Sequence, residues 1–266
     1  MLNFTLYKYG MKGSWKMLLI FAAVLTMYVS IIISMFDPEM MSLLDDYAKA
    51  MPEIMAAVGM TAGAATMIGF MSSYLYGFIL LIFPMVFSIL CANRLIARHV
   101  DRGSMTYLLA APVKRRTVVF TQMKVIATGI FALVLFVTVL EIIICEASFP
   151  GELEIGKLLA LNAGLLSLQL FIGGICFLCS CIFSDNRYAV GLGAGIPALA
   201  YILQMLSNFN EKLENIKYAT FFTLFDTNGI IAGEAGAIAG MIVLFAGAVV
   251  LFTAAIVIFS KKDLHI

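Results

Sequence analysis

Long apolar stretches alternate with shorter polar segments along the whole chain. Each stretch holds enough consecutive apolar residues to cross about 30 Å of hydrocarbon as an α-helix that rises about 1.5 Å per residue. The six stretches cover residues 17–35, 74–93, 125–145, 158–183, 188–207 and 235–259. The pattern therefore predicts an all-α integral membrane protein, in which six transmembrane helices form a single domain over residues 1–266.

The composition agrees with that prediction and argues against a soluble domain. Of the 266 residues, 62% are hydrophobic and 12% are charged, whereas globular domains hold roughly 45–50% apolar and 25% charged residues. So few charges cannot cover the surface of a soluble fold. The net charge of +1 gives no reason to expect a nucleic-acid partner, and the lipid bilayer is the expected surrounding.

The distribution of Lys and Arg predicts the orientation in the membrane, because loops that stay in the cytoplasm hold an excess of them. Thirteen of the 17 basic residues fall in the two chain ends, in the segment 94–124 and in the turn 184–187. Only three of the 16 acidic residues do so. Both termini are therefore expected in the cytoplasm. An even number of helices likewise places them on the same side of the membrane.

Two segments outside the six spans are expected to lie along the membrane surface. Residues 1–16 mix aromatic side chains with Lys8, Lys12 and Lys16. This mixture suits an in-plane helix in the cytoplasmic headgroup layer, with a frayed chain end as the alternative. The Met-rich segment 36–73 is expected to form short helices on the outer face, which either pack on the helix ends or offer an adaptable contact surface.

One string imitates a nucleotide-binding loop. GELEIGKL, at residues 151–158, has the glycine and lysine spacing of such a loop. However, Leu158 stands where Ser or Thr would hold magnesium, and Glu152 and Glu154 would repel phosphate. We therefore expect no nucleotide to bind this chain through that string.

The cysteines and histidines give no sign of a metal or catalytic centre. All five cysteines lie inside or at the ends of apolar stretches, and the group Cys176, Cys179 and Cys181 lacks a second ligand pair with metal spacing. We interpret them as reduced, buried thiols. The only histidines, His99 and His265, fall in cytoplasmic segments. The chain is therefore not expected to be an enzyme or to bind a metal or cofactor itself.

Glu141 is the one acidic residue inside a confident span. It is expected about one turn from the outer end of its helix, so its carboxylate could reach the interface by snorkelling. The alternative is a polar contact on a substrate pathway, because carboxylates inside membranes often serve function.

Small residues and prolines inside the spans predict close packing and bent helices. Glycine pairs let helix backbones approach closely in lipid, and prolines bend or loosen helices. The glycine pairs are Gly173 with Gly174, Gly191 with Gly195, and Gly236 with Gly240, and the prolines are Pro84 and Pro197.

The cytoplasmic segment between the second and third spans, residues 94–124, contains more than the basic residues that membrane orientation requires. It reads NRLIARHVDRGSMTYLLAAPVKRRTVVFTQMK from Asn93 and combines bases with apolar residues at helical intervals and a central turn. An ordinary cytoplasmic loop would need the bases but not the ordered apolar residues. We call residues 94–124 the connector.

In the connector the chain resembles the ABC-2 type permeases, the membrane subunits of ATP-binding-cassette exporters. Many of these carry an acidic residue, a nearby Gly, a Leu-Leu pair and Pro-Val-x-Arg in the segment that docks on the ATPase. The matching residues are Asp101, Gly103, Leu108, Leu109, Pro112, Val113 and Arg115. The amphipathic N-terminal segment, the outer FFTLFDTNGIIAG at 221–233 and the FSKKDLHI ending extend the resemblance over the whole chain.

The resemblance implies a permease subunit without its own ATPase domain, in a multi-pass arrangement in the bacterial cytoplasmic membrane. It further implies a second permease copy, identical or related, and two cytoplasmic ABC ATPase subunits that bind the ATP and Mg²⁺. A cytoplasmic coupling helix would lie in the connector between the second and third spans. Its expected ATPase contacts are Arg98, Asp101, Arg102, Gly103, Tyr107, Leu108, Leu109, Pro112, Lys114 and Arg115.

The expected cargo follows from the lack of charge in the spans, which suits an amphipathic or lipid-like molecule. An amphipathic peptide is favoured, and an antibiotic or a lipid is the alternative within the family. Two other classes of function are an intramembrane enzyme and a membrane scaffold or channel that works without an ATPase. The first is disfavoured because no catalytic cluster falls in the spans.

Overall fold

The computed structural model describes residues 2–37, 66–101, 114–209 and 220–262. Most of these residues are helical, and no strand occurs among them. The helices are α1 (Phe4–Ser34), α4 (Met67–Met71), the π-helical η1 (Ser72–Ile79), α5 (Leu80–Ala92), the π-helical η2 (Asn93–Ala97), α6 (Arg98–Asp101), α8 (Arg115–Ser148), α9 (Ile155–Ile182), α10 (Asn186–Phe209), the short 3₁₀ helix η4 (Phe221–Leu224), α11 (Thr227–Ala232) and α12 (Ala235–Lys261).

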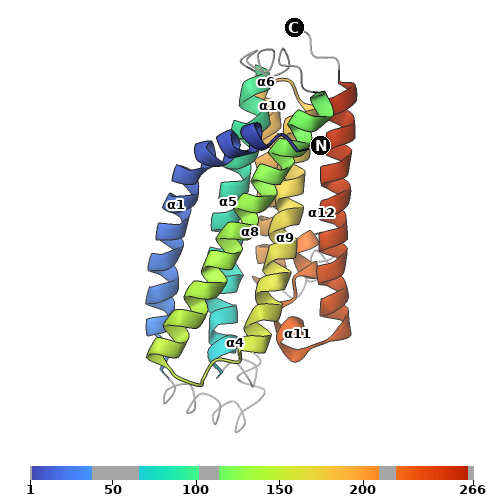
Figure 1. Cartoon of the computed structure of the whole chain (residues 1–266). Coiled ribbons are helices and arrows are strands. Elements are labelled where there is room, and N and C mark those ends of the chain that lie inside the picture. Colours follow the sequence, from blue (N-terminus) through green and yellow to red (C-terminus); the bar gives the residue numbers. More distant parts are fainter. Residues whose placement is uncertain (1, 38–65, 102–113, 210–219, 263–266) are drawn as a thin grey trace.

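Six long helices in the described residues can cross a membrane, which confirms the predicted fold class. The segments α4 to α6 follow one another without a break and form the second span, Met67–Asp101, which we call the α4–α6 helix. The other five spans are α1, α8, α9, α10 and α12. They stand side by side in an elongated bundle (Figure 1).

Helix α9 lies at the centre of the bundle and is the most buried span. Its glycines make this possible, because a Cβ at Gly173 would come within 2.6 Å of Ile130 in α8, and a Cβ at Gly174 within 3.0 Å of Leu251 in α12. The prediction of close packing is thus confirmed for this pair. Within the described part of the chain, a Cβ added at Gly191 or Gly195 would meet nothing within 4 Å.

Helix α1 extends further than the hydrophobic pattern predicts. A separate in-plane helix over residues 1–16 is not seen, because a single helix runs from Phe4 to Ser34. The side chain of Asn3 accepts from the Leu6 amide at 3.0 Å and so caps the helix start. The first turns nevertheless cross the end of the bundle before the helix turns along its length (Figure 1), and exposed Phe4, Tyr9 and Trp15 lie there. Their position in the headgroup layer remains a prediction.

The α4–α6 helix is irregular where the sequence places a proline. Pro84 has no backbone N–H, so the carbonyl of Leu80 loses its usual intrahelical donor. The side chain of Gln169, from α9, donates to the carbonyls of Leu80 at 3.1 Å and Leu81 at 3.0 Å. A buried glutamine therefore stabilises the disrupted backbone beside the π-helical turns of η1, which end at Ile79.

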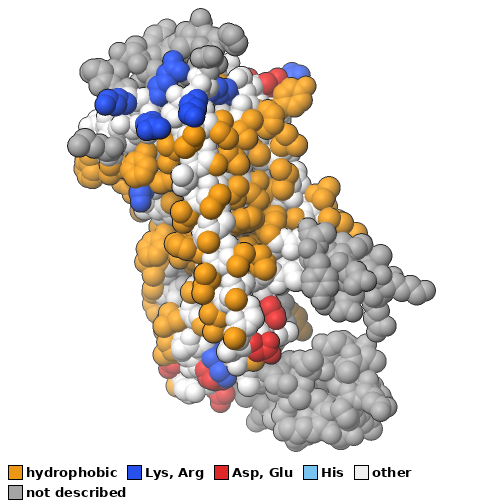
Figure 2. Space-filling view, turned by 90° about the vertical axis from the view of Figure 1, so that its right-hand side faces the viewer, with side chains coloured by type: hydrophobic (Ala, Val, Ile, Leu, Met, Phe, Trp, Pro, Cys, Tyr) orange, Lys and Arg blue, Asp and Glu red, His pale blue; other side chains and the backbone are white. Residues whose placement is uncertain are grey.

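The two ends of the bundle differ in charge. The start of α1 and the end of α12 lie at the same end (Figure 1), as an even number of spans requires. Lys and Arg side chains gather at this end and Asp and Glu side chains mainly at the opposite end (Figure 2). We call them the inner and outer ends, following the predicted orientation. Most of the Met-rich outer segment, residues 38–65, and residues 102–113 of the connector lie outside the described residues.

Candidate functional site

The described parts of the connector are its two flanks. Asp101 is the last residue of α6, and Arg115 is the first residue of α8. Arg98, Asp101, Lys114 and Arg115 are all exposed, so their side chains can be reached by a partner. The remaining predicted contacts lie outside the described residues, namely Arg102, Gly103, Tyr107, Leu108, Leu109 and Pro112.

On the first flank, Asp101 joins the α4–α6 helix to the start of α10. Its Oδ1 accepts a hydrogen bond from the backbone N–H of Asn186 at 3.2 Å. The first N–H groups of a helix have no intrahelical acceptor, and a carboxylate there is favoured by the helix dipole. Asp185 supplies a second, local cap by accepting from the Arg187 amide at 2.7 Å. The start of α10 is thus held both by its own turn and by the flank of the connector.

On the second flank, Arg115 joins the start of α8 to the end of α12. Its Nη1 donates to the carbonyl oxygen of Lys262 at 3.1 Å. Lys262 in turn donates through Nζ to the carbonyl of Cys181, near the end of α9, at 3.3 Å. Desolvation by burial lowers the pKa of Lys262. One chain of hydrogen bonds therefore links the inner ends of α8, α12 and α9.

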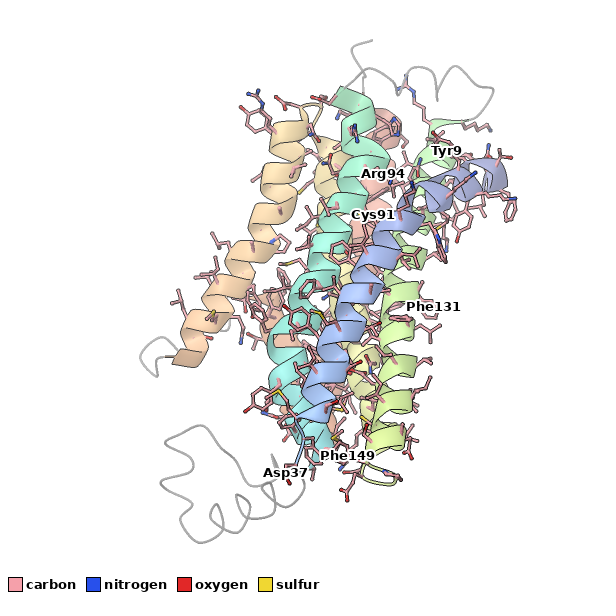
Figure 3. All side chains as sticks on the ribbon, turned by 90° about the vertical axis from the view of Figure 1, so that its left-hand side faces the viewer. Tyr9, Asp37, Cys91, Arg94, Phe131 and Phe149 are labelled. Atoms are coloured by element: carbon pink, nitrogen blue, oxygen red, sulfur yellow. The ribbon has the colours of Figure 1, made fainter. Side chains whose placement is uncertain are left out.

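A third contact fixes α1 to the same inner end. The guanidinium of Arg94 lies so close to Gly13 that a Cβ there would come within 2.9 Å of it. One turn away, the Oγ of Ser14 and the Sγ of Cys91 lie 3.8 Å apart. Figure 3 shows Cys91 and Arg94 on the α4–α6 helix where α1 passes it. This contact is not predictable from the hydrophobic pattern, in which Gly13 is only a glycine on the polar side of the first span.

Glu141 lies in a buried polar cluster in the outer part of the bundle. Its Oε2 accepts from the hydroxyl of Tyr76 at 3.0 Å and from Nδ2 of Asn162 at 2.8 Å. The three residues come from α8, η1 and α9 and are almost fully buried. We call them the Glu141 cluster. Asn162 also donates to the Leu158 carbonyl at 3.3 Å.

The snorkelling interpretation of Glu141 is therefore wrong. Helix α8 continues to Ser148, so Glu141 lies roughly two turns inside its end, and its side chain has no exposed surface. Within the described residues, Glu141 Oε1 and Asn162 Oδ1 have no hydrogen-bond partner. The cluster holds three helices together, and its place on a substrate pathway remains a prediction.

The string that imitates a nucleotide-binding loop connects two helices, α8 and α9. A phosphate-binding loop would instead follow a strand. Its lysine, Lys157, is paired with Glu154 at 2.7 Å. The five cysteines are free and buried, and the described residues contain no group of His, Cys, Asp and Glu that could hold a metal ion.

Together, six apolar spans, an irregular second span and a basic inner end define a multi-pass membrane protein whose two ends differ in charge. A comparison with protein families makes the class specific. The family described as ABC-2 family transporter protein matches residues 10–264. The chain belongs to this family and is a permease of the ABC exporter type.

Proteins of this family generally work with ATPase partners. A comparison with curated proteins gives no match.

Proposed function

We propose that this chain is the permease subunit of an ABC exporter in the bacterial cytoplasmic membrane, driven by a separate cytoplasmic ATPase that docks on the connector. Two ATPase subunits would bind the ATP and Mg²⁺, and a second permease copy, identical or related, would complete the pathway. The chain itself would bind no nucleotide and catalyse no reaction. The cargo would be an amphipathic peptide, with an antibiotic or a lipid as the alternative.

The observation that carries the proposal is the bonding of the two flanks of the connector. Asp101 reaches the start of α10, and Arg115 reaches the end of α12. A protein that pushes on the connector therefore acts on two further spans through directed hydrogen bonds. Movement of a docked ATPase can be converted in this way into movement of helices in the membrane.

The expected size of the effect follows from the strength of such links. A helix-capping hydrogen bond is worth about 1 kcal/mol, and a coupling free energy cannot exceed the interactions that carry it. Since about 1.4 kcal/mol corresponds to a factor of ten, loss of the Asp101 link should reduce coupled transport about fivefold.

The test is to purify the chain with its ATPase and measure ATP-driven transport in vesicles. Asp101→Ala should lower transport per ATP hydrolysed about fivefold while membrane insertion stays unchanged. Asp185→Ala is the matched control, because it removes a cap from the same helix start but leaves the link from the connector. If no ATPase accompanies the chain, or if both variants reduce transport equally, the proposal is wrong.

A further inference from the structure

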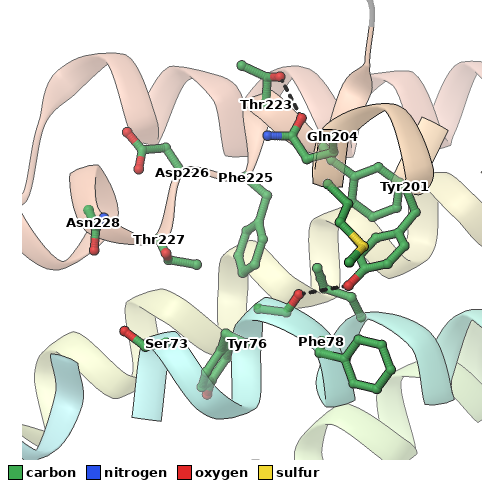
Figure 4. Close-up of a pocket in the computed structure, with 14 residues that line it drawn as sticks. Ser73, Tyr76, Phe78, Tyr201, Gln204, Thr223, Phe225, Asp226, Thr227 and Asn228 are labelled. Atoms are coloured by element: carbon green, nitrogen blue, oxygen red, sulfur yellow. Dashed lines mark hydrogen bonds between the residues drawn. The ribbon is translucent and has the colours of Figure 1, made fainter. Parts of the chain in front are cut away.

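A cavity of about 640 Å³ opens in the outer part of the bundle, between η1, the end of α10 and the segment from η4 to α11. Tyr201 of α10 ties these walls together, because its hydroxyl donates to the carbonyl of Gly77 at 3.1 Å. Gln204, one turn later, accepts from the hydroxyls of Thr220 and Thr223 at 2.6 and 3.0 Å. The cavity is therefore held by specific polar contacts between its walls (Figure 4).

The walls combine aromatic rings with uncharged polar groups. Phe78, Tyr201 and Phe222 form a connected series, with ring centroids 6.5 and 5.6 Å apart. Phe225 points toward Tyr76 on the opposite wall (Figure 4). Tyr76 is also a member of the Glu141 cluster, because its hydroxyl donates to the carboxylate of Glu141. The cavity and the cluster are therefore neighbours. Rings of this kind bind apolar groups and also attract cations through their faces.

Among the described residues, the charge that lines the cavity is negative. Among the described residues that line it, Asp226 is the one charged residue, and none is Lys or Arg. The described outer end as a whole carries the carboxylates of Asp37, Glu146, Glu152, Glu154, Asp226 and Glu234. Its one described base, Lys157, is paired with Glu154. The shortage of bases at this end follows from the predicted orientation, whereas the carboxylates themselves contribute little to orientation.

We propose that this cavity binds the positive charge of a lipophilic organic cation. The aromatic walls would hold the apolar body of the molecule, and Asp226 at the rim would attract its charge. The acidic outer end would favour the same sign of charge over a longer distance. The inference rests on the proposed function in one respect: it specifies the cargo of the permease as a cationic amphiphile.

Binding can be measured on the full chain alone in lipid nanodiscs, without ATPase. Tetraphenylphosphonium and tetraphenylborate serve as probes, since they share size and shape and differ in the sign of their charge. Equilibrium dialysis against protein-free nanodiscs of the same lipid removes the contribution of the bilayer. The proposal predicts saturable binding of the phosphonium to the protein and no saturable binding of the borate.

Three variants test the site itself. Asp226→Asn keeps the acceptor that caps α11 through the Gly229 amide and removes the charge, so phosphonium affinity should fall about fivefold. Asn228→Lys adds a positive charge to an exposed lining residue and should lower the affinity at least tenfold. Glu234→Gln, which removes a charge from the same outer end outside the cavity, should change the affinity less than twofold. Circular dichroism and size-exclusion profiles identify any variant that fails to fold.

A cationic amphipathic peptide and its lysine-acetylated form are then added as competitors. They distinguish the two kinds of molecule that could carry the charge, a peptide and a small organic cation. Displacement of the phosphonium by the cationic form alone identifies a peptide, and no displacement by either form identifies a small organic cation. Equal binding of the two probes, or unchanged affinity in both Asp226→Asn and Asn228→Lys, would overturn the proposal. Because no ATPase is present, this result is independent of whether the chain couples to one.

Discussion

The inner and outer ends of this bundle use polar groups in different ways. At the inner end, exposed side chains bond to backbone groups at helix ends, as Asp101 does to α10 and Arg115 to α12. Toward the outer end, buried side chains bond to one another, as Tyr76 and Asn162 do to Glu141. Bonds between exposed groups at helix ends can be remade when helices move, whereas a buried cluster resists rearrangement because each unpaired group is costly.

This difference between the two ends indicates which part of the molecule can move. The inner end contains links that a docked protein can push on, and the outer part contains a fixed cluster beside a cavity. The irregular α4–α6 helix connects the two, since η1 carries Tyr76 and α6 carries Asp101. A change at the connector can therefore reach the wall of the cavity through a single helix.

The largest expected effect concerns the buried cluster. Glu141→Ala should lower the free energy of unfolding by about 2–3 kcal/mol, because the Tyr76 hydroxyl would lose its acceptor and the Asn162 amide would lose one of its two. Thermal denaturation in detergent measures the change. Glu146→Ala, at an exposed position near the end of the same helix, is the control and should change stability by less than about 0.5 kcal/mol. Equal effects of the two variants would show that the cluster does not hold the helices together.

A smaller effect is expected where Pro84 disrupts the backbone of the α4–α6 helix. Gln169→Leu should lower stability by about 1–2 kcal/mol, because the carbonyl of Leu80 would lose its side-chain donor. Pro84→Ala restores the backbone N–H that this carbonyl lacks. The double variant should therefore be more stable than Gln169→Leu alone, as a double-mutant cycle by thermal denaturation would measure. Simple additivity of the two changes would contradict this role of Gln169.

The smallest effect on stability is expected at the inner end. Arg115→Gln should change the free energy of unfolding by less than about 0.5 kcal/mol, because the bond to Lys262 is exposed. Transport should nevertheless fall a few-fold, since the link between α8 and α12 is lost. Arg116→Gln, at the next exposed position, should leave ATP-driven transport in vesicles near the wild-type value. If stability falls as much as in Glu141→Ala, the two ends do not differ as described.

The spans could be predicted from the sequence because the bilayer requires long apolar helices, and six such stretches stand out in the hydrophobic pattern. The helix ends could not be predicted from hydropathy. Helix α8 begins at Arg115, ten residues before its predicted apolar stretch, because a helix continues into water as long as its backbone bonds are satisfied. The same reason explains why α1 begins at Phe4 and includes the residues expected to form a separate helix.

The site was only partly accessible from sequence. Glu141 was conspicuous as a carboxylate in an apolar stretch. Its partners Tyr76 and Asn162 come from other helices, and the rotation of one helix relative to another cannot be predicted from the sequence of either helix. The flanks of the connector were singled out as expected ATPase contacts, and that role stays a prediction. Their bonds to Asn186 and Lys262 depend on how helix ends meet in space, which local patterns do not contain.

Photo-crosslinking in the native cell tests most directly whether a separate ATPase docks on the connector. A photoreactive amino acid at exposed Lys114 should form a covalent adduct that mass spectrometry identifies as an ABC ATPase subunit. The same label at Glu234, at the outer end, should capture no ATPase. If Lys114 yields no ATPase adduct in actively transporting cells, the account of the connector is contradicted.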